Sequence, residues 1–143
     1  MDNLIKKDFT SGEVRRYYEQ IRNHEIEFDK ILPDGWMSRY CELEIEIYRK
    51  GCSIEIIGNN LNVSTGMKLT IYIDGKELGK ERIHLGEFRI KMEVPFEIEE
   101  GNHILRLEAN RTFSYYNQTK RDILAYSVLV SKIFVNGMIV WER

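Results

Sequence analysis

The chain has 143 residues, of which 43% are hydrophobic, 31% charged and 11% aromatic, and its formal net charge is −2. This length suits a single domain that buries roughly 68–70% of the surface of its unfolded chain, and the composition excludes a disordered protein. Basic and acidic residues are interspersed along almost every segment, so no basic patch marks a nucleic-acid partner.

Residues 1–24 are predicted to form an N-terminal segment with one short amphipathic helix. Glu13 follows Thr10 and Ser11 at a spacing typical of a helix cap, and the stretch EVRRYYEQIR carries apolar side chains at helical spacing. The first residues lack the apolar stretch of a signal peptide, and no apolar run is long enough to span a membrane. We therefore expect a cytoplasmic protein without a membrane span.

Residues 25–143 are predicted to form one β-sandwich domain. Polar and apolar positions alternate over residues 25–29 and in the segment CELEIEIYR. Six further strand candidates follow, namely CSIEIIG, KLTIYID, EFRIKMEV, HILRLEA, the long apolar-rich run ILAYSVLVSKIFV and MIVWE. Turn residues such as Asp74-Gly75 and Asn136-Gly137 separate these segments. About eight strands with no helices between them predict an all-β, jelly-roll-like sandwich of two antiparallel sheets.

The same alternation predicts which side chains face the shared core. Every second residue of a strand points to the same face of its sheet. The predicted core residues are Leu43, Ile45, Ile47, Leu69, Ile71, Ile73, Phe88, Ile90, Leu105 and Leu107.

The segment 110–122 is predicted to be a long loop between the two sheets, and it is rich in aromatic and basic residues. Phe113 continues the inward phase of the preceding strand HILRLEA, so we expect it to anchor the loop to the core. Tyr115 has the same phase and Tyr116 the opposite one. Because both carry a hydroxyl, at least one is expected at the surface beside Arg111.

No residue pattern in the sequence indicates catalysis or a cofactor. The three histidines lie in separate segments, and Cys41 and Cys52 have neither metal-ligand spacing nor the number needed for a disulfide framework. There is no nucleophile elbow, no glycine-rich phosphate loop before a helix and no marked carboxylate pair. We expect a protein that is not an enzyme and that binds no metal or cofactor.

Aromatic residues outside the alternating faces are the candidates for ligand binding. A flat ring suits the apolar face of a sugar, and charged neighbours bond its hydroxyls. The predicted ligand-binding residues are Trp36, Arg39, Arg111, Tyr115, Tyr116 and Arg121. Asp34 and Asp122 are further polar candidates. The alternative is that the same rings anchor loops to the core, and the sequence leaves both roles open.

Four short motifs follow one another between about residues 26 and 136. They are Asp34-Gly35-Trp36, Ile73-Asp74-Gly75, Gly86-Glu87-Phe88 and Arg111-Thr112-Phe113. Their order resembles that of the non-catalytic β-sandwich domains attached to bacterial glycosyltransferases, which are carbohydrate-binding-like in fold. The chain departs from this family at Ser114-Tyr115-Tyr116, where a proline is common, and in the order of charge at Lys120 and Asp122.

Two functional hypotheses remain in competition after these exclusions. The first is a non-catalytic module that binds glycan or serves a glycosyltransferase or polysaccharide-synthesis system. The second is a structural or oligomerisation module, in which the aromatic residues are buried and the N-terminal helix mediates assembly with another chain or a second copy. An enzyme on a jelly-roll scaffold is the weakest reading. Exposure of Trp36, Tyr115 and Tyr116 distinguishes the first two hypotheses.

Overall fold

The computed structural model describes residues 25–62, 66–117 and 121–143. These residues form eleven β-strands, and none of them is helical. The predicted N-terminal helix lies outside the described residues. No helix in the described part of the chain is long and apolar enough to cross a membrane.

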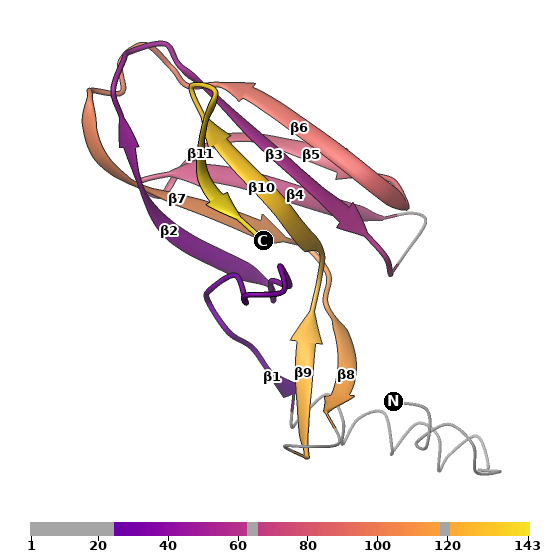
Figure 1. The fold of residues 1–143 in the computed structure, drawn as a ribbon. Coiled ribbons are helices and arrows are strands. Elements are labelled where there is room, and N and C mark those ends of the chain that lie inside the picture. Colours follow the sequence, from indigo (N-terminus) through magenta and orange to yellow (C-terminus); the bar gives the residue numbers. More distant parts are fainter. Residues whose placement is uncertain (1–24, 63–65, 118–120) are drawn as a thin grey trace, which may run out of the picture.

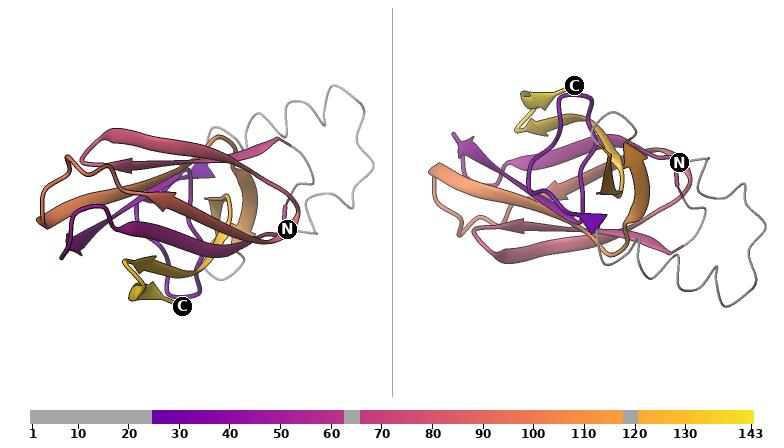
Figure 2. Two further views of the ribbon diagram at one scale, coloured as in Figure 1. Left: turned by 90° about the horizontal axis from the view of Figure 1, so that it is seen from above. Right: turned by 90° about the horizontal axis from the view of Figure 1, so that it is seen from below.

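Two four-stranded sheets pack face to face and form the body of the molecule (Figures 1 and 2). The β10 sheet has the strand order β11 (Met138–Glu142), β10 (Leu129–Val135), β3 (Ser53–Asn60), β6 (Gly86–Glu93). The β7 sheet has the strand order β2 (Tyr40–Ile47), β7 (Gly101–Ala109), β4 (Met67–Ile73), β5 (Lys76–Ile83). Every pairing within these two sheets is antiparallel. The predicted all-β, two-sheet sandwich is confirmed.

A third, smaller sheet lies at one end of the sandwich (Figure 1). It has the strand order β1 (Glu25–Ile26), β9 (Asp122–Tyr126), β8 (Phe113–Asn117), with β1 parallel and β8 antiparallel to β9. The prediction of a loop over residues 110–122 is therefore wrong for its centre. The aromatic residues Phe113, Tyr115 and Tyr116 favour an extended strand, and pairing with β9 satisfies the backbone groups of this segment.

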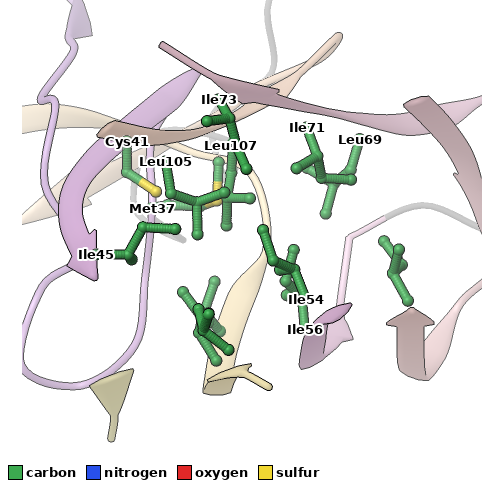
Figure 3. Close-up of a cluster of buried hydrophobic side chains, with 14 of the residues drawn as sticks. Met37, Cys41, Ile45, Ile54, Ile56, Leu69, Ile71, Ile73, Leu105 and Leu107 are labelled. Carbon is green, nitrogen blue, oxygen red and sulfur yellow. The ribbon is translucent and has the colours of Figure 1, made fainter. Parts of the chain in front are cut away.

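The core lies between the two large sheets and is mainly aliphatic (Figure 3). All of the predicted core residues are buried except Leu43, which is half-buried and packs against the cluster. Each fully buried aliphatic side chain contributes roughly 1.5–3 kcal/mol of transfer free energy. The alternation in the sequence thus identified the inward faces of β2, β4, β6 and β7.

The strands differ from the prediction in three places: one strand was not predicted, one predicted strand is divided in two, and one is shorter than predicted. β5 was not expected, because the edge strand KELGKERI is exposed along most of its length and shows no apolar alternation. The run 123–135 is divided between β9 and β10, since Ser127 leaves the small sheet to donate its backbone N–H to the Met37 carbonyl at 2.9 Å. In the stretch 25–29 only Glu25–Ile26 is a strand.

Candidate functional site

Three aromatic rings meet where the small sheet joins the sandwich, and we call them the aromatic triad: Trp36, Tyr115 and Tyr126. Trp36 stacks on Tyr126 with ring centroids 4.8 Å apart and an interplanar angle of 8°. Tyr115 lies 6.0 Å from Trp36 and 5.2 Å from Tyr126, tilted against both. All three side chains are half-buried. Such ring pairs contribute about 0.5–1.5 kcal/mol beyond the burial of their area, so the triad holds a defined geometry at the surface.

Trp36 is positioned by the segment that precedes β2, which lies across the start of β10. Gly35 has φ +100° and a Cβ there would approach the Val130 carbonyl oxygen to 2.4 Å, so only glycine permits this contact. Backbone hydrogen bonds join Val130 N–H to the Gly35 carbonyl at 2.7 Å and Met37 N–H to the Val128 carbonyl at 3.1 Å. These bonds fix the backbone on both sides of Trp36.

Tyr115 and Tyr126 are brought to one face of the small sheet by strand register. Phe113 pairs with Tyr126 and Tyr115 with Leu124, and directly opposed residues share a face. Tyr116 pairs with Ile123 on the opposite face. The predicted opposite phases of Tyr115 and Tyr116 are confirmed, and both side chains are half-buried rather than fully buried.

Phe113 packs half-buried against the core, as an anchor of β8 should. A fourth ring, that of Phe28, meets Tyr126 edge-on at 5.9 Å with an interplanar angle of 82°. Phe28 therefore contacts the stacked pair of Trp36 and Tyr126 through Tyr126 and is not itself stacked in it. The triad is therefore supported from two sides, by β8 and by the segment that follows β1.

The electrostatics of the triad keep its phenols protonated. Burial raises the pKa of Tyr115 above its ordinary value. Burial, with a smaller effect of the negative charge on Asp34, raises the pKa of Tyr126. Asp34 is exposed next to Trp36, and its Oδ1 accepts the Trp36 backbone N–H at 3.4 Å. The site thus offers apolar ring surface, neutral hydroxyls and one neighbouring carboxylate.

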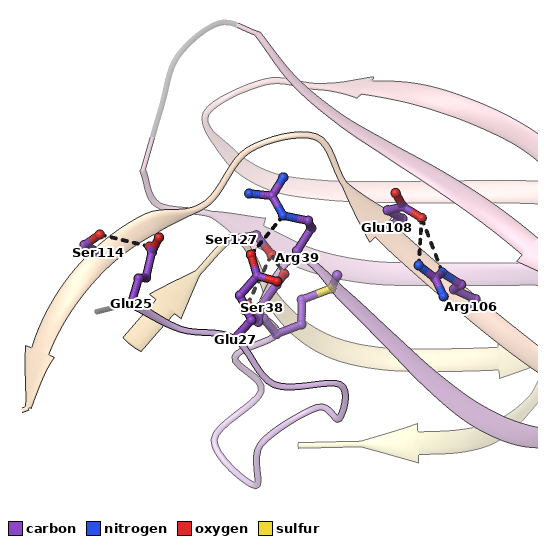
Figure 4. Close-up of polar contacts among 9 residues, drawn as sticks. Glu25, Glu27, Ser38, Arg39, Arg106, Glu108, Ser114 and Ser127 are labelled. Carbon is purple, nitrogen blue, oxygen red and sulfur yellow. Dashed lines mark hydrogen bonds and ion pairs between the residues drawn. The ribbon is translucent and has the colours of Figure 1, made fainter. Parts of the chain in front are cut away.

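Among the described residues, no contact that the structure defines joins the three predicted arginines to the triad or to one another. Arg39 is paired with Glu27, with Nε and Oε1 3.0 Å apart (Figure 4). The exposed Arg111 lies over the Phe113 ring at 5.3 Å. Arg121 is exposed in the turn between β8 and β9, with φ +56°. A ligand-binding role for these side chains stays a prediction, as it does for Tyr116.

Two residues of the site were missed in the sequence. Tyr126 belongs to the apolar run 123–135, which hid the break at Ser127 and made the tyrosine look like part of one long strand. Asn62 accepts a hydrogen bond from the Tyr115 hydroxyl, but it stands 53 positions away in the chain. A polar residue directly after a strand was the only signal for Asn62, and such residues are common in turns.

The described residues contain no group of three or more His, Cys, Asp or Glu side chains that could hold a metal ion. Cys41 and Cys52 are buried free thiols. Burial raises the pKa of Cys41 to about 12, so this thiol stays protonated near neutral pH.

No protein-family model and no curated protein matches this sequence. Among solved structures, the chain is similar to a family 35 carbohydrate-binding module from an environmental isolate, with TM-score 0.51 and 11% identity over 79% of this chain and 82% of that one. Two further structures have TM-scores below 0.5, each at 12% identity over 84% of this chain and 88% of the other. They are Xyl-CBM35 in complex with a glucuronic acid containing disaccharide, with TM-score 0.47, and CBM35 from Cellvibrio japonicus Abf62, with TM-score 0.45. The first of these likenesses shows that the chain has a β-sandwich fold like that of a carbohydrate-binding module.

Proposed function

We propose that this chain is a non-catalytic carbohydrate-binding module and that the aromatic triad is its sugar-stacking surface. The observation that carries the proposal is the placement of Trp36, which lies half-buried with one ring face on Tyr126. A ring held in this way loses little freedom when a ligand binds, because its partner has already fixed its orientation. The face of Trp36 turned away from Tyr126 is the proposed platform for the apolar face of a sugar.

Two charged side chains near the triad supply the polar contacts in this proposal. Asp34 is exposed beside Trp36 and accepts hydrogen bonds from sugar hydroxyls. Arg111 is exposed two residues before β8 and donates to hydroxyls or to an acidic sugar. Tyr116 lies on the other face of β8 and has no place in this platform. Arg39 contributes by its bond to Glu27, which holds the two ends of the segment 27–39 together.

We further propose that the module serves a glycosyltransferase or a polysaccharide-synthesis system in the cytoplasm. The order of the four motifs from Asp34-Gly35-Trp36 to Arg111-Thr112-Phe113 supports this part of the proposal. Genes for glycosyltransferases or polysaccharide export next to the gene for this chain would agree with it. Co-purification of the full chain with the product of such a neighbouring gene tests it directly, and a failure to co-purify would remove the accessory role without affecting sugar binding.

The test of sugar binding is a glycan array probed with the wild-type chain, a Trp36→Ala variant and an Arg111→Ala, Tyr115→Ala double variant. Tyr48→Ala is the matched control, because Tyr48 is 59% exposed at the end of β2 and takes no part in the triad. We expect the wild type and the control to bind the same glycans and both site variants to lose at least about tenfold in affinity, the effect of losing one stacked ring. Binding that survives Trp36→Ala would reject the platform.

The competing proposal is a structural module, and one observation favours it: the rings of the triad contact one another as well as solvent. In that case the wild type binds no glycan, while Trp36→Ala lowers the melting temperature or changes the oligomeric state. Sedimentation of wild type and Trp36→Ala in parallel with the array separates the two proposals. A second copy of the chain is the partner that this experiment detects.

A further inference from the structure

We propose that Asn62 is a positioning residue that fixes the three rings of the aromatic triad relative to one another. This proposal rests on the proposed function in so far as the rings bind sugar. The arrangement of the rings themselves can be measured without a ligand. Asn62 is half-buried two residues after the end of β3, a strand of the β10 sheet, whereas Tyr115 lies in β8 of the small sheet.

Both ends of the Asn62 side-chain amide are used. The Tyr115 hydroxyl donates to Oδ1 of Asn62, and Nδ2 of Asn62 donates to the Ser127 carbonyl at 2.8 Å. The backbone N–H of Asn62 donates to Oδ1 of Asn60 at 3.2 Å. A single amide thus connects β8 with the junction between β9 and β10. No apolar side chain can replace both bonds.

Ser127 carries the connection from Asn62 to the other two rings. It directly follows Tyr126 in the chain, so the bond to its carbonyl fixes the backbone beside that ring. Its Oγ donates to the Ser38 carbonyl at 2.5 Å or to the Met37 carbonyl at 3.1 Å, and its N–H donates to the Met37 carbonyl (Figure 4). Met37 and Ser38 follow Trp36. Each ring of the triad is therefore within one or two residues of a hydrogen bond in this network.

The inner members of the network are fully buried, whereas Asn62 and Tyr115 are half-buried. Ser127 and Asn60 have no exposed surface, and Nδ2 of Asn60 donates to the His84 carbonyl at 3.3 Å. Water cannot readily replace a partner that is lost in such a place, so removing one member leaves the others unpaired. The phenol of Tyr115 would then turn away from Trp36 and Tyr126, because the tilted ring contacts alone do not fix its torsion.

The experiment is a double-mutant cycle of Asn62→Ala and Tyr115→Phe in a Trp141→Phe background, where Trp36 is the single tryptophan. Tyr115→Phe keeps the ring and removes only its bond to Asn62. The tryptophan fine structure of the near-ultraviolet circular dichroism, at wavelengths where tyrosine and phenylalanine do not absorb, is the dichroic band that reports the surroundings of Trp36 without ligand. Affinity for the best array glycan reports binding. We expect each single variant to lose part of the dichroic band and about 2- to 10-fold in affinity, and the double variant to lose no more than the worse single.

Additive losses in the double variant, or an unchanged dichroic band in Asn62→Ala, would overturn the proposal. Asn102→Ala is the matched control, since Asn102 is exposed at the start of β7, at the opposite end of that strand from the connection to β8. If Asn62→Ala does not fold, Tyr115→Phe alone decides, because it must change the band. If the wild type binds no glycan, the proposed function fails but the dichroic measurement still tests Asn62.

Discussion

The sandwich body and the end that carries the aromatic triad are held together by different interactions. In the described residues, the largest fully buried side chains are all isoleucine, leucine or methionine, and they come mainly from the two large sheets. The triad end relies instead on four aromatic rings in mutual contact and on hydrogen bonds from Asn62 and Ser127. The body is a dry core, whereas the end is half-buried and polar.

This difference shows how the chain separates stability from the geometry of its site. Aliphatic side chains of the right volume fill a core in several arrangements, so the body tolerates small rearrangements. Rings stacked at 8° and hydrogen bonds of defined direction permit one arrangement only. A change in the body is expected to alter the stability of the whole domain, and a change in the end is expected to alter the local surface first.

The largest effect is expected from a substitution in the body. Leu107 has no exposed surface and lies in β7, between β2 and β4. Its replacement by alanine should lower the free energy of unfolding by about 2–5 kcal/mol, because it removes transfer energy and leaves a cavity. Urea denaturation followed by far-ultraviolet circular dichroism measures the loss. A change below about 1 kcal/mol would contradict the description of this sheet as the core of the domain.

A smaller effect is expected from the anchor of the triad end. Phe113 is half-buried against the core. Phe113→Ala should therefore lower the free energy of unfolding by less than roughly 3 kcal/mol, the smallest loss usual for replacing a fully buried phenylalanine by alanine. Tyr116→Ala, on the opposite face of the same strand, is the matched control and should cost about 1 kcal/mol or less. Denaturation curves for both variants test the order. If Phe113→Ala costs as much as Leu107→Ala, the two regions are not distinct in energy.

The fold of the body could be predicted because its strands alternate cleanly. The buried positions of Ile71, Leu105 and Leu107 could be predicted without knowing which strands lie beside them, because a period of two residues alone assigns each side chain to a face of its sheet. β5 was not predicted, because an exposed edge strand carries few apolar side chains and so shows no alternation of polar and apolar residues. The small sheet was not predicted, because β1 and β9 pair in parallel across a separation of 98 positions, from Glu25 to Ile123. No local sequence pattern encodes such a pairing.

The candidate site could be predicted only in part, for a related reason. Trp36 and Tyr115 stood out as aromatic residues outside the regular pattern, and their rings do lie together. Tyr126 and Asn62 were hidden, because their importance comes from contacts with distant residues and not from their neighbours in the chain. Residue type and phase indicated which side chains are unusual, and only the tertiary structure indicated which of them meet.

At the opposite end of β7 from the triad, a charged contact joins the turn between β4 and β5 to the start of β7. Nδ1 of His103 lies 2.6 Å from Oδ2 of Asp74, and Nε2 lies 2.6 Å from the Glu99 carbonyl oxygen. Oδ1 of Asp74 accepts the Ile104 N–H at 2.9 Å. With acceptors at both ring nitrogens, the imidazole is suited to carry both protons. This end of the strand thus depends on charge, whereas the triad end depends on neutral rings.

The smallest effect is expected from pH, and it should appear only at this charged end. The Asp74 hydrogen bond raises the pKa of His103, so the stabilisation is complete below the unfolded value of about 6.5 and is lost as pH rises through the folded pKa. The Ile104 N–H, with His103, lowers the pKa of Asp74, so its stabilisation is present above about 3.9 and is lost as pH falls through the folded pKa. The difference in melting temperature between wild type and Asp74→Asn should therefore be greatest between about pH 4 and 6.5.

Asparagine tolerates the φ of +51° at position 74, so the variant removes the charge and keeps the turn. His84→Gln, at an exposed histidine, is the control and should follow the wild-type profile. A difference that stays constant from pH 4 to 9 would mean that the charge of this pair does not contribute to folding.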